Sequence, residues 1–345
     1  MGATVAVVGA SGHTGSFVIA ELLARGHRPI AVGRDPTRLA AARWAHDDIP
    51  VRVASLDRLE LERALAGAHV VINCAGPFLD TADTVVNAAL EVGAHYLDVT
   101  AEQASAADTL DRFGERASDV GVTVSPAVGF FGGLADVLLT SLIDELGGVG
   151  DIDTATIAIA LDSWHPTPGT RATGARNNVP RVTIRNGQLA PLTASPPGAT
   201  WTFVEPFGTQ PVDAVAFSEV PLIARHLRVR HLDTFLNTAP LSDLRDPATP
   251  PPLPADDLGR SAQRFAVDVT AQGSSTVRRV SATGTDIYAV TAPIVVAAVE
   301  QVVAGVEAGA HPVGAILNTK QLLNALSDRS DHGEPPIRLV TPRPA

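Results

Sequence analysis

The first residues whose types and spacing could do chemistry are three glycines, Gly9, Gly12 and Gly15, which follow an apolar stretch of strand length. Their pattern, G-x-x-G-x-x-G, is related to the G-x-G-x-x-G turn that binds dinucleotides. Glycines permit a tight turn and let backbone N–H groups approach a diphosphate, and the N-terminus of the next helix adds its dipole. Polar side chains between the glycines add donors to this turn: Ser11, His13 and Thr14. We expect a diphosphate-binding loop here, with a purely structural glycine turn as the alternative.

Two arginines indicate which dinucleotide the loop binds. Arg34 ends the second predicted strand, and Arg38 lies one helical turn further on. An arginine at this strand end recognises the 2′-phosphate of NADP, whereas NAD sites place a carboxylate there for the ribose hydroxyl. Two guanidinium groups can clamp one phosphate through charge-assisted hydrogen bonds. We therefore expect NADP(H), and Asp35 between the arginines keeps NAD open as the alternative.

A turn of small residues follows the fourth predicted strand and ends in an aromatic residue: Cys74, Ala75, Gly76, Pro77 and Phe78. Small side chains let the backbone approach the nicotinamide ribose, and the Phe78 ring can form a wall beside the nicotinamide. We expect these five residues to contact the cofactor. Cys74 is interpreted as a small packing residue rather than a nucleophile, because no neighbouring group would favour its thiolate.

Three side chains are candidates for acid–base catalysis. Asp98 and Glu102 follow the fifth predicted strand, and ligands of open α/β sheets bind at the carboxyl ends of strands. Glu102 has a structural alternative, since it can also charge the start of the next helix. His165 lies in a turn of the second predicted domain. An imidazole can donate a proton to a hydride acceptor near neutral pH. The alternative there is a surface loop; in the catalytic interpretation, Arg171 and Arg176 would hold a substrate carboxylate or phosphate.

These residues need a scaffold, and strands alternate with helices through the first third of the chain. The predicted strands are Thr4–Val8, Pro29–Val32, Val51–Val53, His69–Asn73, His95–Asp98 and Val122–Ser125. The predicted helices are Thr14–Arg25, Thr37–Arg43, Arg58–Leu65, Thr81–Val92 and Gln103–Val120. Continuous apolar strands separated by amphipathic helices are typical of a parallel sheet covered on both faces. We expect an α/β fold with a doubly wound Rossmann-type sheet.

The pattern then changes to alternating strands, which predict a second, α+β domain on an open antiparallel sheet. A long helix over Gly129–Leu146, ending at Gly147-Gly148, leads into it, and Asn186-Gly187 predicts a two-residue hairpin. The proline-rich run Pro247–Pro254 predicts an extended loop. Helices over Ile287–Ala304 and Thr319–Leu326 are expected to pack back on the first domain. The predicted domains are thus residues 1–128 completed by 287–345, and residues 129–286.

Composition excludes several classes of protein. The 345 residues are 45% hydrophobic and 18% charged, which is typical of a globular chain with two domains. The net charge is −11 with Lys320 as the only lysine, so no basic surface for nucleic acid is expected. The single cysteine and the absence of a leader or a membrane-spanning stretch predict a soluble, cytoplasmic protein. No metal-ligand spacing, Y-x-x-x-K pair or G-x-S-x-G elbow occurs, so no metal site is expected.

Five segments resemble one known family: Gly9–Gly15, Asn73–Phe78, Tyr96–Glu102, Pro126–Asp136 and Gly284–Ala292. Together they are similar to the saccharopine dehydrogenase-like NAD(P)-dependent oxidoreductases, a broad family that includes imine-reducing enzymes and trans-acting enoyl reductases. The resemblance covers most of the first predicted domain and the second only loosely. It implies a Rossmann domain, an α+β domain for substrate binding and dimerisation, and hydride transfer.

The sequence therefore predicts an NADP(H)-dependent reductase that acts on a C=N or conjugated C=C bond of a small metabolite. The protein would orient the substrate, exclude water and supply one proton. A homodimer is expected from the apolar second sheet. The alternative function is an NADP-binding sensor or scaffold without turnover, because no unmistakable acid–base pair is present.

Overall fold

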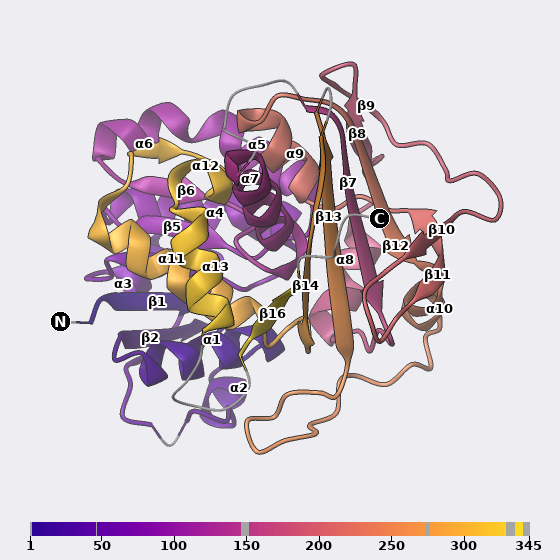
Figure 1. Ribbon diagram of the computed structural model, residues 1–345. Helices are drawn as coiled ribbons and strands as arrows, with labels where there is room; N and C mark the ends of the chain where they lie inside the picture. Colours follow the sequence, from indigo (N-terminus) through magenta and orange to yellow (C-terminus); the bar gives the residue numbers. More distant parts are fainter. Residues whose placement is uncertain (1, 46, 146–151, 274–275, 329–334, 341–345) are drawn as a thin grey trace.

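The computed structural model describes residues 2–45, 47–145, 152–273, 276–328 and 335–340. Two β-sheets dominate the molecule, and each is accompanied by helices (Figure 1). The first third of the chain forms one sheet, and the second sheet stands beside it. Among the described residues, no helix combines the length and the apolar character that crossing a membrane requires.

The first sheet is parallel throughout, in the order β15-β6-β5-β4-β1-β2-β3. Its strands are β1 (Thr4–Val8), β2 (Arg28–Gly33), β3 (Val51–Val53), β4 (Val70–Asn73), β5 (His95–Asp98), β6 (Thr123–Ser125) and β15 (Gly309–Ala310). Its helices are α1 (His13–Ala24), α2 (Pro36–Ala40), α3 (Arg58–Leu65), α4 (Phe78–Glu91), α5 (Gln103–Arg112) and α6 (Gly114–Val120). The strand order reverses at β1, so a crevice opens at the carboxyl ends of β1 and β4. The Rossmann-type fold predicted from the sequence is confirmed.

The second sheet has nine strands, with the path β10-β11-β12-β7-β13-β14-β16 and the β8–β9 hairpin beside β12. Its strands are β7 (Ile152–Leu161), β8 (Val182–Arg185), β9 (Gln188–Pro191), β10 (Thr200–Thr202), β11 (Thr209–Ala214), β12 (Val229–Asn237), β13 (Arg264–Gln272), β14 (Val277–Thr285) and β16 (Ile337–Val340). The remaining helices of the chain are α7 (Ala135–Glu145), α8 (Pro168–Arg176), α9 (Glu219–His226), α10 (Thr238–Arg245), α11 (Thr291–Gly305), α12 (Val313–Ile316) and α13 (Thr319–Ser327).

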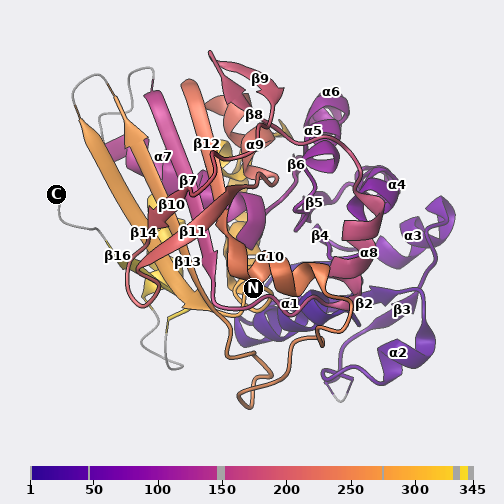
Figure 2. The ribbon, with the colours of Figure 1, turned by 90° about the vertical axis from the view of Figure 1, so that its right-hand side faces the viewer.

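The second sheet is mixed rather than antiparallel, which corrects the prediction. Its central strands β7 and β12 run parallel, with Ile152 opposite Val229 and Ile159 opposite Leu236. A parallel pair needs a long crossover, and the segment between these strands supplies α8, α9 and the β8–β11 strands. The predicted hairpin is confirmed, since Asn186 and Gly187 both have positive φ between β8 and β9. In Figure 2, β10 and β11 cross the face of the sheet that is turned away from the first.

Two predicted helices differ from the structure near their ends. The predicted helix Gln103–Val120 is divided into α5 and α6 by the buried Phe113. The predicted helix from Gly129 begins instead with a turn over Phe130–Leu134, in which Gly132 has φ of 99°, and regular helix starts at Ala135. A Cβ on Gly132 would lie 2.6 Å from the Ser218 hydroxyl, so close packing requires glycine there. Leu146 and the predicted stop at Gly147-Gly148 lie outside the described residues.

The late helices lie against the first sheet's side of the molecule. α11 packs on α1, where Arg25 and Glu300 form an ion pair of 3.1 Å, and α13 packs on α11 and α7 (Figure 1). α11 starts four residues later than expected, because Asp286 accepts the N–H groups of Tyr288 and Ala289 and holds a turn there. The segment Pro247–Pro254 contains no helix or strand, as predicted. The predicted domain boundaries stay predictions.

Candidate functional site

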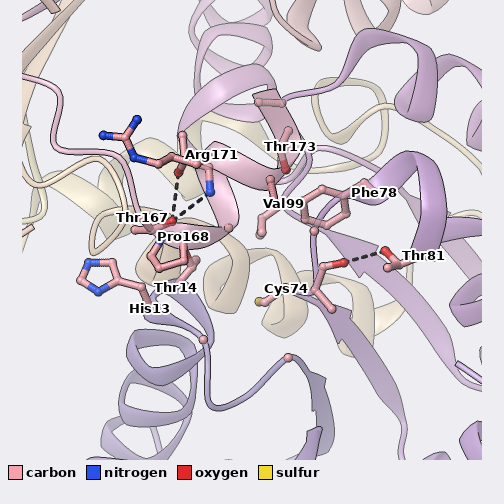
Figure 3. A pocket seen from close by; sticks show the side chains of 18 of the residues that line it. His13, Thr14, Cys74, Phe78, Thr81, Val99, Thr167, Pro168, Arg171 and Thr173 are labelled. Carbon is pink, nitrogen blue, oxygen red and sulfur yellow. Dashed lines mark hydrogen bonds between the residues drawn. The ribbon is translucent and has the colours of Figure 1, made fainter. Parts of the chain in front are cut away.

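One cavity of about 880 Å³ runs along the carboxyl ends of the first sheet and continues under the second sheet (Figure 3). At one end it is lined by the glycine loop, Arg34 and Arg38. In the middle it is lined by Ala75, Gly76, Phe78 and Val99, and α8 forms the opposite wall. Aromatic side chains line the other end of the cavity. A cavity at this position is where open α/β sheets bind their ligands.

The glycine loop is packed too tightly for side chains. Gly9 has φ of 81°, and a Cβ on it would lie 3.0 Å from the backbone of Ala75. A Cβ on Gly15 would lie 2.3 Å from the Gly9 carbonyl oxygen, so Gly15 shapes the loop without lining the cavity. The buried Trp44 indole donates to the Ala10 carbonyl at 3.2 Å and anchors the loop from behind. The remaining predicted loop residues line the cavity: Gly9, Ser11, Gly12, His13 and Thr14.

Both predicted phosphate-binding arginines line the cavity and are exposed. Neither side chain of Arg34 or Arg38 has a hydrogen bond or ion pair within the described part of the chain. Asp35 is engaged instead: its carboxylate caps α2 by accepting the N–H groups of Thr37 at 2.9 Å and Arg38 at 3.2 Å. The two free guanidinium groups favour an added phosphate at this end, and the capping role of Asp35 weakens the NAD alternative.

The turn after β4 is held by polar contacts from outside it. Asn73 accepts the Ala75 N–H at 3.0 Å, and Thr81 donates to the Ala75 carbonyl at 2.6 Å. A Cβ on Gly76 would lie 3.0 Å from the Thr173 hydroxyl of α8, so the turn and α8 approach closely. Burial raises the pKa of the Cys74 thiol far above its usual range, which fits its interpretation as a packing residue. Of the predicted turn residues, Cys74, Ala75, Gly76 and Phe78 line the cavity, and Pro77 does not.

Glu102 is placed to position this turn rather than to transfer a proton. Its two carboxylate oxygens accept the N–H groups of Phe78 at 2.7 Å and Leu79 at 3.2 Å, which start α4. The side chain is buried, and burial raises its pKa while the two amides act against that rise. Because each oxygen accepts a backbone donor, the geometry supports a positioning role for Glu102, and its predicted role as a catalytic acid stays a prediction.

Asp98 also departs from the prediction, because it does not line the cavity. It is fully buried and accepts the N–H groups of Ala127 at 2.7 Å and Thr100 at 3.0 Å on one oxygen, and the Tyr96 hydroxyl at 2.9 Å on the other. Burial raises its pKa to about 6, and the three hydrogen bonds limit the rise. Asp98 thus ties the loop after β5 to the loop after β6, away from the cavity wall, and its predicted catalytic role stays a prediction.

The predicted acid His165 points away from the cavity as well. Its Nδ1 lies 3.2 Å from the Pro250 carbonyl of the proline-rich loop, and His165 is absent from the cavity wall. Arg171 donates to the carbonyls of Asp246 and Thr249 in the same loop, and Figure 3 shows its guanidinium directed away from Val99 and Phe78. Arg176 pairs with Asp80 at 2.7 Å. These three side chains hold surface segments together, which the sequence alone did not distinguish from substrate binding.

Sequence reasoning did not assign the aromatic wall at the second end of the cavity. Phe131 stacks on Trp164 with ring centroids 5.4 Å apart and meets Phe217 at 4.2 Å. Tyr288 accepts the Trp164 indole N–H at 3.1 Å and lies edge-on to His13, 5.2 Å between centroids. These residues come from four separate segments, so no local pattern marks them as neighbours. The Phe130-Phe131 pair behind β6, Trp164 in its turn and Tyr288 at a helix start were the available signals.

His13 joins the two ends of the cavity. Its Nε2 is buried without a hydrogen-bond partner, and burial lowers its pKa, so the ring is neutral near pH 7. Among the described residues no group of three histidine, cysteine, aspartate or glutamate side chains could hold a metal ion. A glycine cradle, free arginines and a ring-lined extension together define a dinucleotide-binding Rossmann protein with room for a second ligand.

Comparisons with known proteins identify the family of the first domain. Residues 5–124 match the family model of the saccharopine dehydrogenase NADP binding domain. The chain is 31% identical over 140 residues to a protein of Arabidopsis thaliana named probable mitochondrial saccharopine dehydrogenase-like oxidoreductase. It is 32% identical over 139 residues to the lipid droplet localized protein of Caenorhabditis elegans. Each match covers 36% of this chain and 31% or 33% of the relative, so the chain spans about a third of the length of these relatives.

Solved structures extend the likeness to nearly the whole fold. Saccharopine dehydrogenase (L-Glu forming) from Saccharomyces cerevisiae superposes with a TM-score of 0.62 at 12% identity, over 94% of this chain and 97% of that chain. Amine dehydrogenase from Mycobacterium smegmatis reaches 0.52 at 14% identity, over 92% and 96%. These identities show a shared fold alone. The match of residues 5–124 to the saccharopine dehydrogenase NADP binding domain confirms the resemblance found in the sequence and supports a nicotinamide cofactor.

Proposed function

We propose that this protein is an NADP(H)-dependent oxidoreductase that reduces a C=N or conjugated C=C bond of a small molecule. The single observation that carries the proposal is the continuous cavity, which joins the glycine loop at the carboxyl ends of the first sheet to the aromatic wall under the second. A dinucleotide lying along the first part would bring its nicotinamide beside the second part. The name of the matching domain favours NADP over NAD, as do the free Arg34 and Arg38.

The residues present fit such a cofactor. The glycine loop keeps its tight path because a Cβ at Gly9 or Gly15 would meet backbone atoms, and N–H groups at the start of α1 would hold the diphosphate. Arg34 and Arg38 would hold the 2′-phosphate, while Gly76 and Phe78 would bound the nicotinamide end. When bound, the reduced nicotinamide supplies the hydride.

The rest of the mechanism belongs to the protein's own side chains. Glu102 fixes the start of α4, and Asp98 fixes the loops after β5 and β6, so both are positioning residues for the nicotinamide end. The rings of Phe131, Trp164 and Phe217 exclude water around the reacting bond. No catalytic role is assigned to His165, and the proton that completes the reduction comes from water at the open side of the cavity.

One observation favours the second candidate, an NADP-binding protein without turnover. Both oxygens of the Glu102 carboxylate, the only acidic group at the nicotinamide end of the cavity among the described residues, already accept backbone N–H groups. Such a protein would bind NADPH and leave it unoxidised.

Calorimetry combined with an oxidation assay separates these functions. We expect NADPH to bind more tightly than NADH, and reduced-nicotinamide absorbance to fall when a panel of cyclic imines and conjugated enones is added. Binding without oxidation across both panels would favour the sensor. An absence of heat with either oxidised or reduced nucleotide would overturn both candidates. The expected homodimer is checked in the same samples by sedimentation.

A further inference from the structure

The substrate end of the cavity is lined by a cluster of three aromatic rings, Phe131, Trp164 and Phe217. Trp164 stacks on Phe131 at 5.4 Å, and Phe131 meets Phe217 at 4.2 Å. Aliphatic side chains complete this end: Val215, Leu241, Leu244 and Ile287. Placing several charges against such a wall would cost desolvation energy without compensating partners. The wall therefore favours a ligand with a compact apolar body.

Arg181 lies beside the Phe217 ring of this cluster. Its guanidinium carbon lies 5.0 Å from the centroid of the Phe217 ring, and its Nη1 donates to the Ala216 carbonyl at 2.8 Å. These two contacts hold the guanidinium at the cavity wall, and within the described ranges its Nη2 and Nε donate to no other group. Glu219, the nearest carboxylate, accepts the Phe217 N–H at 2.8 Å and forms no ion pair with Arg181. An exposed cation with free donors thus borders an apolar surface.

The other charged groups of the cavity are engaged or lie at the cofactor end. Both oxygens of Glu102 accept backbone N–H groups, and Arg171 donates to carbonyls of the proline-rich loop. Arg34 and Arg38 flank the glycine loop at the opposite end. Arg171 also lines the cavity, but Figure 3 shows its guanidinium directed away from Val99 and Phe78. In the described parts of the chain, Arg181 is therefore the cation that lies against the aromatic rings of the substrate end and can take an anionic group of a ligand there.

We propose that the substrate is a compact apolar molecule with one carboxylate, which Arg181 holds, and with its reducible bond toward the nicotinamide end at Gly76 and Phe78. The proposal rests on the oxidoreductase function above and names the substrate class of the same site. A planar guanidinium matches a carboxylate through two parallel hydrogen bonds. A phosphate dianion would find a single cation here, beside Glu219.

The reaction balances without a further reactant. A hydride from the reduced nicotinamide adds to the electrophilic carbon of the C=N or C=C bond, and the electron pair of that bond moves to its other atom. That atom takes a proton from water, the oxidised nucleotide leaves, and the carboxylate keeps its charge throughout.

The test compares 3-phenylpropanoate with 3-phenylpropanamide, which has the same apolar body and no charge. Calorimetry is run on the full chain, with and without saturating NADP⁺, so that the comparison does not depend on cofactor binding. We expect the acid to bind about tenfold more tightly than the amide, because hydrogen bonds to a charged group are worth somewhat more than 1 kcal/mol. Glutarate, with two charges and no apolar body, should bind more weakly than the acid.

Two variants locate the effect. Arg181→Gln should make acid and amide bind equally, whereas Arg230→Gln removes a surface guanidinium paired with Asp153 and should keep the preference. Equal binding of acid and amide by the wild type would overturn the proposal, as would a preference that survives in Arg181→Gln or no binding of either probe. Titration of NADPH into the same samples reports on the proposed function separately. Normal NADPH binding without an acid preference would leave that function standing and reject the substrate class.

Discussion

The two ends of the cavity differ in what forms their surface: backbone at the cofactor end and side chains at the substrate end. At the cofactor end the backbone forms the surface, since the glycines carry no side chains and Gly9 approaches Ala75 with no space for a Cβ. At the substrate end side chains form the surface, through Phe131, Phe217 and Arg181. The difference teaches that binding at the first end depends on the conformation of one short loop, whereas binding at the second depends on packing between distant segments.

Adding one methyl group to the loop gives the largest expected effect. In Gly15→Ala the new Cβ would lie 2.3 Å from the Gly9 carbonyl, so the loop must shift, and we expect NADPH affinity to fall about 100-fold, as for an overpacking cost of about 3 kcal/mol. Calorimetry measures the affinity. Gly174→Ala in α8 is the matched control, because its Cβ would have no atom within 4 Å. If both variants bound NADPH like the wild type, the cofactor end would not depend on its backbone as described.

The next largest effect is expected from the buried carboxyl group of Asp98, which fixes the loops after β5 and β6. The pKa of Asp98 is about 6 in the folded protein, above the usual value of 3.8, so between these pH values the folded chain holds a proton that the unfolded chain has lost. Its contribution to the free energy of unfolding is therefore complete below about pH 4 and is lost as the pH rises through 6. We expect a loss of about 2 to 3 kcal/mol across this window, measured by urea unfolding at several pH values.

The variant Asp98→Asn isolates this effect, because it cannot ionise. Its free energy of unfolding should lack the downward slope that Asp98 gives the wild type between pH 4 and 6, while Asp111→Asn at the surface should keep it. An unchanged slope in Asp98→Asn would show that another group titrates there.

Replacing Arg34 and Arg38 tests what side chains, as distinct from the backbone, contribute to binding at the cofactor end. Arg34→Gln combined with Arg38→Gln should weaken NADPH binding about tenfold and leave NADH binding unchanged, because exposed charge-assisted contacts are individually modest. The difference should shrink at high salt. Arg58→Gln, which removes an exposed arginine paired with Glu62, serves as the control. Equal losses for NADPH and NADH would place these arginines away from the 2′-phosphate.

The smallest effect is expected for the histidine that the sequence marked as an acid. His165→Ala removes a ring that faces the Pro250 carbonyl outside the cavity, so kcat and KM should stay within about twofold of the wild type. Tyr288→Phe provides the contrast, since it leaves the Trp164 indole N–H without its acceptor inside the cavity. A large loss of kcat in His165→Ala alone would return that residue to the catalytic machinery.

The sequence predicted the elements that depend on neighbouring residues and missed those that depend on residues far apart in the chain. The strands Thr4–Val8 and His95–Asp98 and the helix Arg58–Leu65 agree with the structure residue for residue, because buried runs and the Asp57 cap are local signals. The parallel pairing of β7 with β12 was missed, since it depends on a crossover of almost seventy residues. The short β15 joins the first sheet from the far end of the chain for the same reason.

By itself, the sequence determined the Rossmann sheet, the glycine loop and the position of the two arginines, because each depends on residues close together in the chain. Only the tertiary structure decided what the ionisable side chains do: Asp98 and Glu102 are occupied by backbone N–H groups, and His165 faces outward. Only folding brought Phe217 and Arg181 beside Phe131. The physical reason is that a side chain's hydrogen-bond partners and burial depend on which distant segments pack against it, and a local pattern carries no record of them.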